Sequence, residues 1–178
     1  MSRILKRIAA GVVIAGVAAL LLAAGGYAAG ARVNTTKSIP VGLYWTSSAP
    51  VEKGAYVLFC PPQLGVFDDA KERGYIGAGF CQGGYGYMMK RVLAAKDDAV
   101  AVADHGVRVN GELLPLSAPI KADKAGRPLP RYQSNSYTLG NSEVLLMSDV
   151  SATSFDGRYF GPINRSQIKT VIRPVITW

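Results

Sequence analysis

The chain of 178 residues has a single histidine, His105, and only two cysteines, Cys60 and Cys81. Zinc sites combine several cysteine and histidine ligands at short spacings such as Cys-x-x-Cys. No such spacing occurs here, so we expect no metal and no cofactor. The histidine lies between Asp104 and Gly106 in a turn-like segment. This position indicates a surface residue and argues against a serine–histidine–aspartate triad.

Acidic residues are also few, with 12 Asp and Glu against 20 Lys and Arg, which gives a formal net charge of +8. Three positive charges lie at the N-terminus (Arg3, Lys6 and Arg7), which leaves 8 − 3 = +5 for the rest. Those residues are scattered, without a basic run that could follow a phosphate backbone. We therefore expect no nucleic-acid partner. Proximity to an anionic lipid surface explains the excess of positive charge.

Charge is absent altogether between Arg7 and Arg32, where residues 8–31 form an apolar run of 24 residues. A run of this length predicts a transmembrane helix, and its basic flank predicts a cytoplasmic N-terminus. We therefore expect a cytoplasmic flank at 1–7, a transmembrane anchor or uncleaved signal at 8–31, and a periplasmic domain at 32–178. A cleaved signal peptide is the alternative, because Ala-Gly-Ala at 29–31 has the form of a cleavage site.

Beyond the apolar run the pattern predicts a mainly β domain. One amphipathic helix is expected at 63–74, stopped by Gly74, with a short polar connector at 32–37 and a polar loop or small insertion at 117–136. Glycines between 77 and 86 lack the Gly-x-Gly-x-x-Gly order of a dinucleotide site and indicate a loop. Strands are predicted at 41–45, 55–59, 87–93, 99–102, 137–139, 144–147 and 168–176, with an Asn-Gly hairpin at 107–114.

Cys60 and Cys81 can form one disulfide in an oxidising periplasm. Two free buried thiols are the alternative.

With histidine chemistry set aside, serine with lysine remains as a nucleophile and base. Lysine acts as a base only when neutral, and burial among apolar groups lowers its pKa toward that state. Lys90 lies on the predicted strand 87–93, where alternation places it on one face with Met88 and Val92 and directs Arg91 to the other. The alternative is an edge-strand lysine that prevents aggregation.

Three segments then follow in order along the chain. Thr-Lys-Ser-Ile-Pro at 36–40 resembles the nucleophile box of type I signal peptidases, and Lys-Arg-Val at 90–92 resembles their lysine box. Residues 154–161 resemble the Ser-x-Asp-Ser-Arg box of the family. Gly-Leu-Tyr after the serine, Cys-Pro-Pro at 60–62 and the small size are similar to the conjugative transfer signal peptidases, which mature pilin subunits.

The resemblance implies roles for the residues around the nucleophile. Ser38 would attack the scissile carbonyl, and Lys90 would take its proton. Thr36 stands where a hydroxyl residue helps the Ser38 backbone N–H to form the oxyanion hole. Ile39 stands where the family commonly has methionine, beside the substrate groove, so the cleavage preference could shift.

The third box implies supporting roles. Ser154 stands where a serine hydrogen-bonds the lysine amine. Asp156 and Arg158 stand where an ion pair braces the site, and Asp156 is counted among the catalytic residues because it would help to orient Lys90. The alternative is a tight turn with a surface ion pair, worth about 1 kcal/mol or less.

The sequence therefore predicts a signal-peptidase-like β domain behind one transmembrane helix, on the periplasmic face of the bacterial inner membrane. Its expected substrate is a pilin precursor, cleaved through an acyl-enzyme that water or the pilin's own amine resolves, the latter giving a cyclic product. Expected partners are the inner membrane and the conjugative secretion machinery. A general leader peptidase and a non-catalytic pilus assembly factor are the alternatives.

Overall fold

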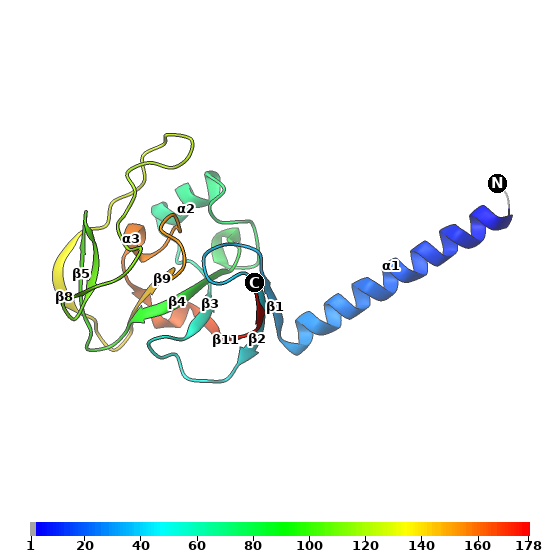
Figure 1. Cartoon of the computed structure of the whole chain (residues 1–178), viewed down its shortest axis with the longest axis horizontal. Helices are drawn as coiled ribbons and strands as arrows, with labels where there is room; N and C mark the ends of the chain where they lie inside the picture. Colours follow the sequence, from blue (N-terminus) through cyan, green and yellow to red (C-terminus); the bar gives the residue numbers. More distant parts are fainter. Residues whose placement is uncertain (1–2) are drawn as a thin grey trace.

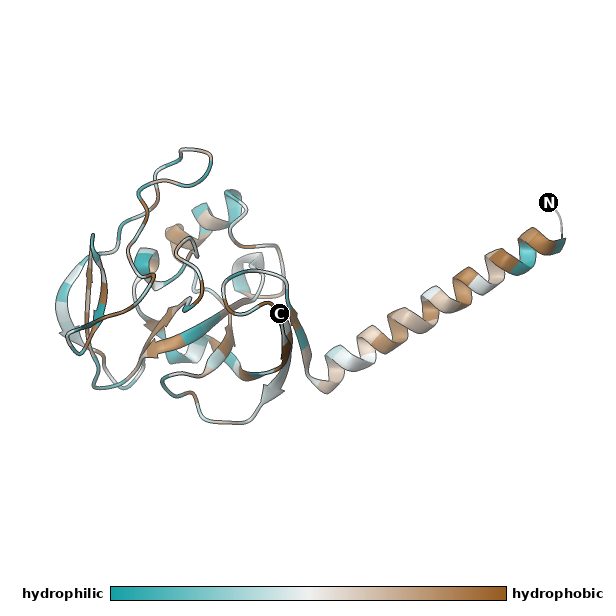
Figure 2. Cartoon of the chain, in the orientation of Figure 1, coloured by the Kyte–Doolittle hydropathy of each residue, from teal (hydrophilic) through white to brown (hydrophobic). Residues whose placement is uncertain are grey.

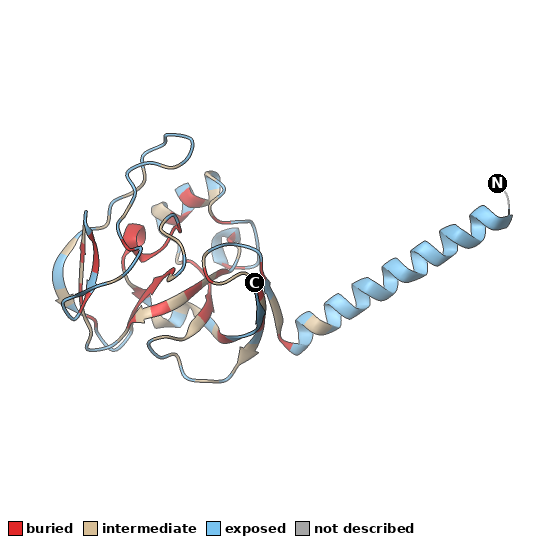
Figure 3. Ribbon diagram, in the orientation of Figure 1, coloured by how far each residue is buried: buried red, intermediate tan, exposed pale blue. Residues whose placement is uncertain are grey.

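A long N-terminal helix and a β-rich body make up the structure, a computed structural model that describes residues 3–178 (Figure 1). The helix, α1 (Arg3–Ala29), projects away from the body, and none of its residues is buried (Figure 3). It is predominantly apolar along its length (Figure 2) and is long and apolar enough to cross a membrane. Of the predicted basic flank, Met1 and Ser2 lie outside the described residues, and the other five residues belong to α1.

The helix ends where Gly30 takes a left-handed backbone with φ +113°. A Cβ at this position would lie 2.3 Å from the Thr46 hydroxyl oxygen, so only glycine fits. The chain then enters strand β1 (Ala31–Asn34), which pairs with β2 (Gly42–Ser47). The prediction of a polar connector at 32–37 is therefore wrong for its first residues. Backbone pairing at a sheet edge makes them a strand despite their polar composition.

The larger sheet has seven strands in the order β1-β2-β11-β3-β4-β9-β10, and all neighbours are antiparallel. Its long strand β11 (Ile168–Thr177) lies between β2 and β3 and accommodates Pro174 at a register shift. Proline is tolerated there because an irregular ladder does not need its missing N–H. The remaining strands are β3 (Tyr56–Phe59), β4 (Met88–Ala94), β9 (Glu143–Met147) and β10 (Ile163–Asn164).

A smaller sheet has four strands in the order β7-β6-β5-β8. These strands are β5 (Ala99–Ala103), β6 (Gly106–Val109), β7 (Glu112–Leu113) and β8 (Ser134–Thr138). Asn110 and Gly111 join β6 to β7 with positive φ angles of 52° and 84°, as a type I′ hairpin turn requires. The Asn-Gly hairpin prediction is confirmed, and each other predicted stretch overlaps a strand.

Short helices complete the body: α2 (Gly65–Glu72), α3 (Gly157–Phe160), and the 3-10 turns η1 (Gln82–Gly84) and η2 (Arg165–Gln167). The predicted helix at 63–74 is α2, which buries Phe67 and Ala70 and ends before Gly74 at φ +77°. The fold is mainly β with an apolar N-terminal helix, as the sequence predicted.

Cys60 and Cys81 form a disulfide that joins the end of β3 to the glycine-rich loop before β4. Both residues belong to the main core cluster, together with Phe67 and Phe155. The crosslink closes a loop with a sequence separation of 21 residues. It therefore restricts the unfolded chain as well as holding this loop against the sheet.

Replacing both cysteines with alanine should lower the free energy of unfolding by about 3 kcal/mol, because the unfolded chain regains loop entropy. Urea unfolding of the full chain in mild detergent, followed by tryptophan fluorescence, measures this change. Reduction of the wild type should produce a loss of similar size. A double variant as stable as the oxidised wild type would show that the crosslink contributes nothing.

Candidate active site

Ser38 lies in the loop between β1 and β2, and its neighbour Ile39 fixes that loop to the core. Ile39 is fully buried and packs in one cluster with Tyr44 and Leu58. Burial of an isoleucine side chain stabilises the folded state by roughly 1.5–3 kcal/mol. With Ile39 fixed in the core, the neighbouring Ser38 is half-buried and lines the surface cavities. Ile39 lines neither of the two cavities at Ser38, and its expected place beside the substrate groove stays a prediction.

Asn34 holds the same loop from the other side and was not predicted. Its Nδ2 donates to the carbonyls of Thr36 (2.7 Å), Ile39 (3.0 Å) and Pro40 (3.1 Å). Its Oδ1 accepts from the Thr36 N–H (3.1 Å) and hydroxyl (2.9 Å). One buried amide thus fixes the backbone on both sides of Ser38. Asparagine often bonds the backbone two residues on, which is the signal that could have identified it.

Lys90 lies on β4, in the middle of the larger sheet. The strand alternates strictly, so Met88, Lys90 and Val92 are buried while Arg91 on the other face pairs with Asp149 at 2.7 Å. The Lys90 side chain is only 2% exposed. The structure therefore agrees with the predicted division of the two faces.

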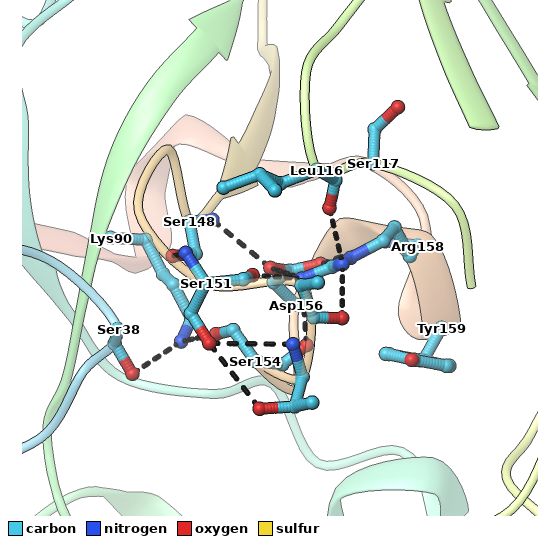
Figure 4. A network of polar contacts seen from close by, with 12 residues as sticks. Ser38, Lys90, Leu116, Ser117, Ser148, Ser151, Ser154, Asp156, Arg158 and Tyr159 are labelled. Carbon is cyan, nitrogen blue, oxygen red and sulfur yellow. Dashed lines mark hydrogen bonds and ion pairs between the residues drawn. The ribbon is translucent and has the colours of Figure 1, made fainter. Parts of the chain in front are cut away.

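The Lys90 amine lies between two serine hydroxyls (Figure 4). Its Nζ is 2.8 Å from Ser38 Oγ and 2.7 Å from Ser154 Oγ. Burial lowers the pKa of Lys90 from 10.5 to about 8. The negative field of Asp156 opposes this shift, and the positive field of Arg158 adds to it. A lysine with this pKa is partly neutral at pH 7, so its amine can accept a proton.

The box around Ser154 is held by a buried ion pair between Asp156 and Arg158 (Figure 4). Arg158 Nη2 lies 2.8 Å from Asp156 Oδ2, and both side chains are fully buried. Asp156 also caps α3 and accepts the Ser148 N–H at 3.0 Å. The surface ion pair that was the alternative does not occur. Among the described residues, Asp156 has no hydrogen bond to Lys90, so it acts on that amine through its field and through the loop it braces.

Arg158 also donates hydrogen bonds to backbone carbonyls of the surrounding loops. It donates to Leu116 (2.8 Å), Ala152 (2.7 Å), Ser151 (3.0 Å) and Ser154 (3.1 Å). Four carbonyls from two loops are thereby fixed around one guanidinium. The segment that carries Ser154 is consequently fixed in two ways. Arg158 binds its backbone carbonyls, and Lys90 binds the Ser154 hydroxyl.

The structure brings all six predicted site residues into one region, with Thr36 beside Ser38 on the walls of both adjacent cavities. His105 is exposed and lies in a turn between β5 and β6. Within residues 3–178, no group of three or more His, Cys, Asp or Glu residues could hold a metal ion.

Two cavities flank Ser38. The larger, of about 430 Å³, lies toward the loop at 120–129. The other, of about 250 Å³, lies toward β4 and the glycine-rich loop. Thr36, Tyr75 and Phe155 line both of them. An extended peptide that crosses Ser38 can therefore place side chains on each side of the nucleophile.

A serine hydroxyl bonded to a buried lysine amine, with a cavity on each side, is an arrangement that a serine peptidase could use. The sequence model of the signal peptidase family, peptidase S26, matches residues 1–178. The chain belongs to this family and is a serine peptidase.

Two relatives and one solved structure are similar to this chain. The chain is 99% identical to plasmid transfer protein TraF of Escherichia coli over 178 residues, which is the full length of both. It is 35% identical to conjugal transfer protein TraF of Agrobacterium fabrum (strain C58) over 168 residues, covering 92% of this chain and 93% of the relative. Among solved structures, a signal peptidase I from Enterococcus faecalis V583 matches with a TM-score of 0.40 and 15% identity, covering 71% of this chain and 100% of the other.

The buried Lys90 makes stability depend on pH. Its pKa is about 8 in the folded state against 10.5 ordinarily, so between these values the unfolded chain binds more protons. The free energy of unfolding attributable to Lys90 therefore rises with pH across this interval, and the cost of burying its charge is fully present below about pH 8. Lys90→Met should be more stable than wild type at pH 7 by about 1–3 kcal/mol.

Urea unfolding measured from pH 7 to above pH 10 tests this difference. The pH slope of stability should be shallower in Lys90→Met than in wild type. The exposed Lys169→Met is the matched control and should retain the wild-type slope. Parallel curves for Lys90→Met and wild type would contradict the assignment of a lowered pKa to Lys90.

Proposed function

We propose that this protein is a membrane-tethered endopeptidase that processes pilin precursors for conjugative transfer, with Ser38 as nucleophile and Lys90 as general base. The observation that carries the proposal is the distance of 2.8 Å between Lys90 Nζ and Ser38 Oγ, with the amine buried in an apolar sheet. A general base must lie within hydrogen-bond reach of the proton it removes, at a pKa near the working pH. Lys90 meets both requirements.

The first half of the reaction acylates Ser38. The neutral Lys90 amine accepts the Ser38 hydroxyl proton as Oγ attacks the scissile carbonyl, and the C–N bond breaks as Lys90 returns the proton to the leaving amine. The Ser38 backbone N–H stabilises the negative carbonyl oxygen of the tetrahedral intermediate, and the Thr36 hydroxyl joins it by turning its hydrogen away from Asn34 Oδ1, to which it donates at 2.9 Å in this structure. One such donor is worth roughly 3–4 kcal/mol of barrier. Asn34, which bonds Thr36 on three atoms, keeps that hydroxyl beside Ser38.

The third box positions the base. Ser154 Oγ accepts from Lys90 Nζ at 2.7 Å and prevents the flexible amine from turning away from Ser38. Asp156 and Arg158 are positioning residues, because they act by fixing the loop that carries Ser154. A mobile lysine amine would lose much of the rate gained from orientation.

The location beside a bilayer is supported by the junction between α1 and the body. Ser38 follows the helix after a short strand and loop, so it stays close to the end of the helix. Tryptophan side chains favour the membrane–water interface, and two of them are exposed on this part of the body. Exposed apolar residues on the strands next to α1 and at the C-terminus are Val33, Trp45, Val175, Ile176 and Trp178. The basic N-terminus favours a cytoplasmic start and hence a periplasmic site.

The conjugative role is supported by the names of the relatives, which are plasmid and conjugal transfer proteins. A pilin precursor inserted in the inner membrane would meet a tethered site at the bilayer surface, next to the conjugative secretion machinery. Either of two nucleophiles, water or an amine, can attack the acyl-enzyme as the acceptor of the acyl group. Water releases a linear product, whereas the pilin's own amino terminus, held at high effective concentration, closes a ring.

If Ser38 and Lys90 form a catalytic dyad, Ser38→Ala and Lys90→Ala should both slow the processing of a purified pilin precursor in detergent. Each should lower the rate of processing by roughly 10³-fold or more, because nucleophile and base act as one unit. In wild type, the rate should fall about tenfold per pH unit below about pH 8 as Lys90 becomes protonated. Ser166→Ala and Lys169→Ala, on the exposed surface, are matched controls and should retain wild-type rates.

Other results would select the alternatives. Normal pilin maturation by Ser38→Ala would identify a non-catalytic assembly factor. Cleavage of unrelated secretory precursors at rates similar to those of pilin would identify a general leader peptidase. Near-normal rates in Lys90→Ala, or a flat pH profile, would exclude Lys90 as the base.

Intact-mass measurement of the processed pilin distinguishes the two acceptors. A product lighter by one water than the linear fragment means that the amine has closed a ring. A product at the linear mass means hydrolysis.

A further inference from the structure

The two cavities beside Ser38 differ in charge. The larger cavity is lined by four charged residues, Lys37, Asp123, Lys124 and Arg127. Among the residues that line the smaller one, Lys90 is the only charged residue. A peptide crossing the nucleophile thus meets four charged residues on one side and, on the other, only the buried Lys90.

Within the larger cavity, Asp123 and Arg127 neutralise each other. Arg127 binds Asp123 Oδ2 through Nε and Nη2, each at 2.7 Å, and the Tyr75 hydroxyl donates to the same carboxylate. Lys37 and Lys124 have no ion-pair partner within the part of the chain that the structure describes, and both are exposed. The lining of the cavity therefore includes two lysines without an ion-pair partner among the described residues.

The loop that carries Lys124 is held in a fixed shape. Asp123 Oδ1 accepts the backbone N–H groups of Ala125 and Arg127, each at 2.9 Å. An isolated bridge joins Ala122 to Pro128. The neighbouring Ile120 N–H donates to Tyr159 at 3.1 Å. Lys124 is consequently presented to the cavity from an ordered turn, which reduces the entropy lost when it binds a ligand.

We infer that the larger cavity is a substrate subsite for a carboxylate of the precursor, bound by Lys37 and Lys124. The inference rests on the proposed function. Ammonium groups recognise carboxylates by charge-assisted hydrogen bonds. Lys37 precedes the nucleophile directly in the chain, so the carboxylate belongs to a residue close to the scissile bond. Either an acidic side chain or the terminal carboxylate of a short leaving peptide supplies this group.

Internally quenched peptides that span the pilin cleavage site test the subsite with the full chain in detergent. One arm places Glu or Gln at single positions across the site, and a second arm compares a C-terminal acid with its amide. At one position, the anionic peptide should be cleaved about five-fold faster than its neutral partner, the size expected for a partly exposed charge pair. The arm that shows the preference identifies the source of the carboxylate.

Variants of Lys124 connect the preference to this cavity. Lys124→Gln should reduce the preference, and Lys124→Glu should reverse it in favour of a peptide with Lys at the same position. Lys121→Glu makes the same charge change in the same loop outside the larger cavity and should keep the wild-type preference. Added salt should weaken the preference, because it screens exposed charges.

The possible failures are separable. If wild type cleaves every matched pair at equal rates, the subsite is wrong while the proposed function stands. If Lys121→Glu changes the preference as much as Lys124→Glu, the charge acts at long range and the subsite is also wrong. If no peptide and no pilin precursor is cleaved, the proposed function fails and the subsite falls with it.

Discussion

The buried amine of Lys90 is the constraint on which the rest of the site depends. A lysine on a central strand loses its hydration, and within residues 3–178 two serine hydroxyls, Ser38 and Ser154, take the place of water at the amine. This environment destabilises the ammonium form and thereby makes a base available near neutral pH. The same burial costs stability, so the surrounding fold has to hold the lysine in a position that it would otherwise leave.

Three distant segments supply that support, each by a different physical means. The loop with Ser38 is fixed by the buried Ile39 and by the amide of Asn34. β4 carries Lys90 between β3 and β9, where the sheet prevents any shift of the backbone. The loop with Ser154 is fixed by Arg158, whose charge is neutralised by Asp156 and whose donors are used on backbone carbonyls. A buried arginine with all these partners confines the loop far better than a surface pair would.

Features with a local cause were predictable from the sequence. Alternation along the strand separated Lys90 from Arg91, the Asn-Gly pair specified its hairpin, and Gly74 marked the end of α2. Spacing alone did not favour Lys90 as a base over an edge-strand lysine. The order of three boxes resembling those of a known family provided that distinction.

Features that depend on distant partners were not predictable. The pairing of β1 with β2 makes a strand of residues read as a connector, and the burial of Ile39 depends on Leu58 and Ile172 from other strands. Asn34 acts through carbonyls that only the folded loop brings together. The larger cavity has a charged lining at Lys124 because residues 120–129 fold back beside Ser38. None of these contacts has a signature within a short window of sequence.

The most direct test of this account is to trap the acyl-enzyme. Wild-type protein and pilin precursor are mixed, quenched in acid and digested, and the peptide that contains Ser38 is analysed by mass spectrometry. We predict that this peptide carries the acyl fragment of the pilin in wild type and does not carry it in Lys90→Ala. An acyl group on another residue, or rapid cleavage of the precursor by Ser38→Ala, would contradict it.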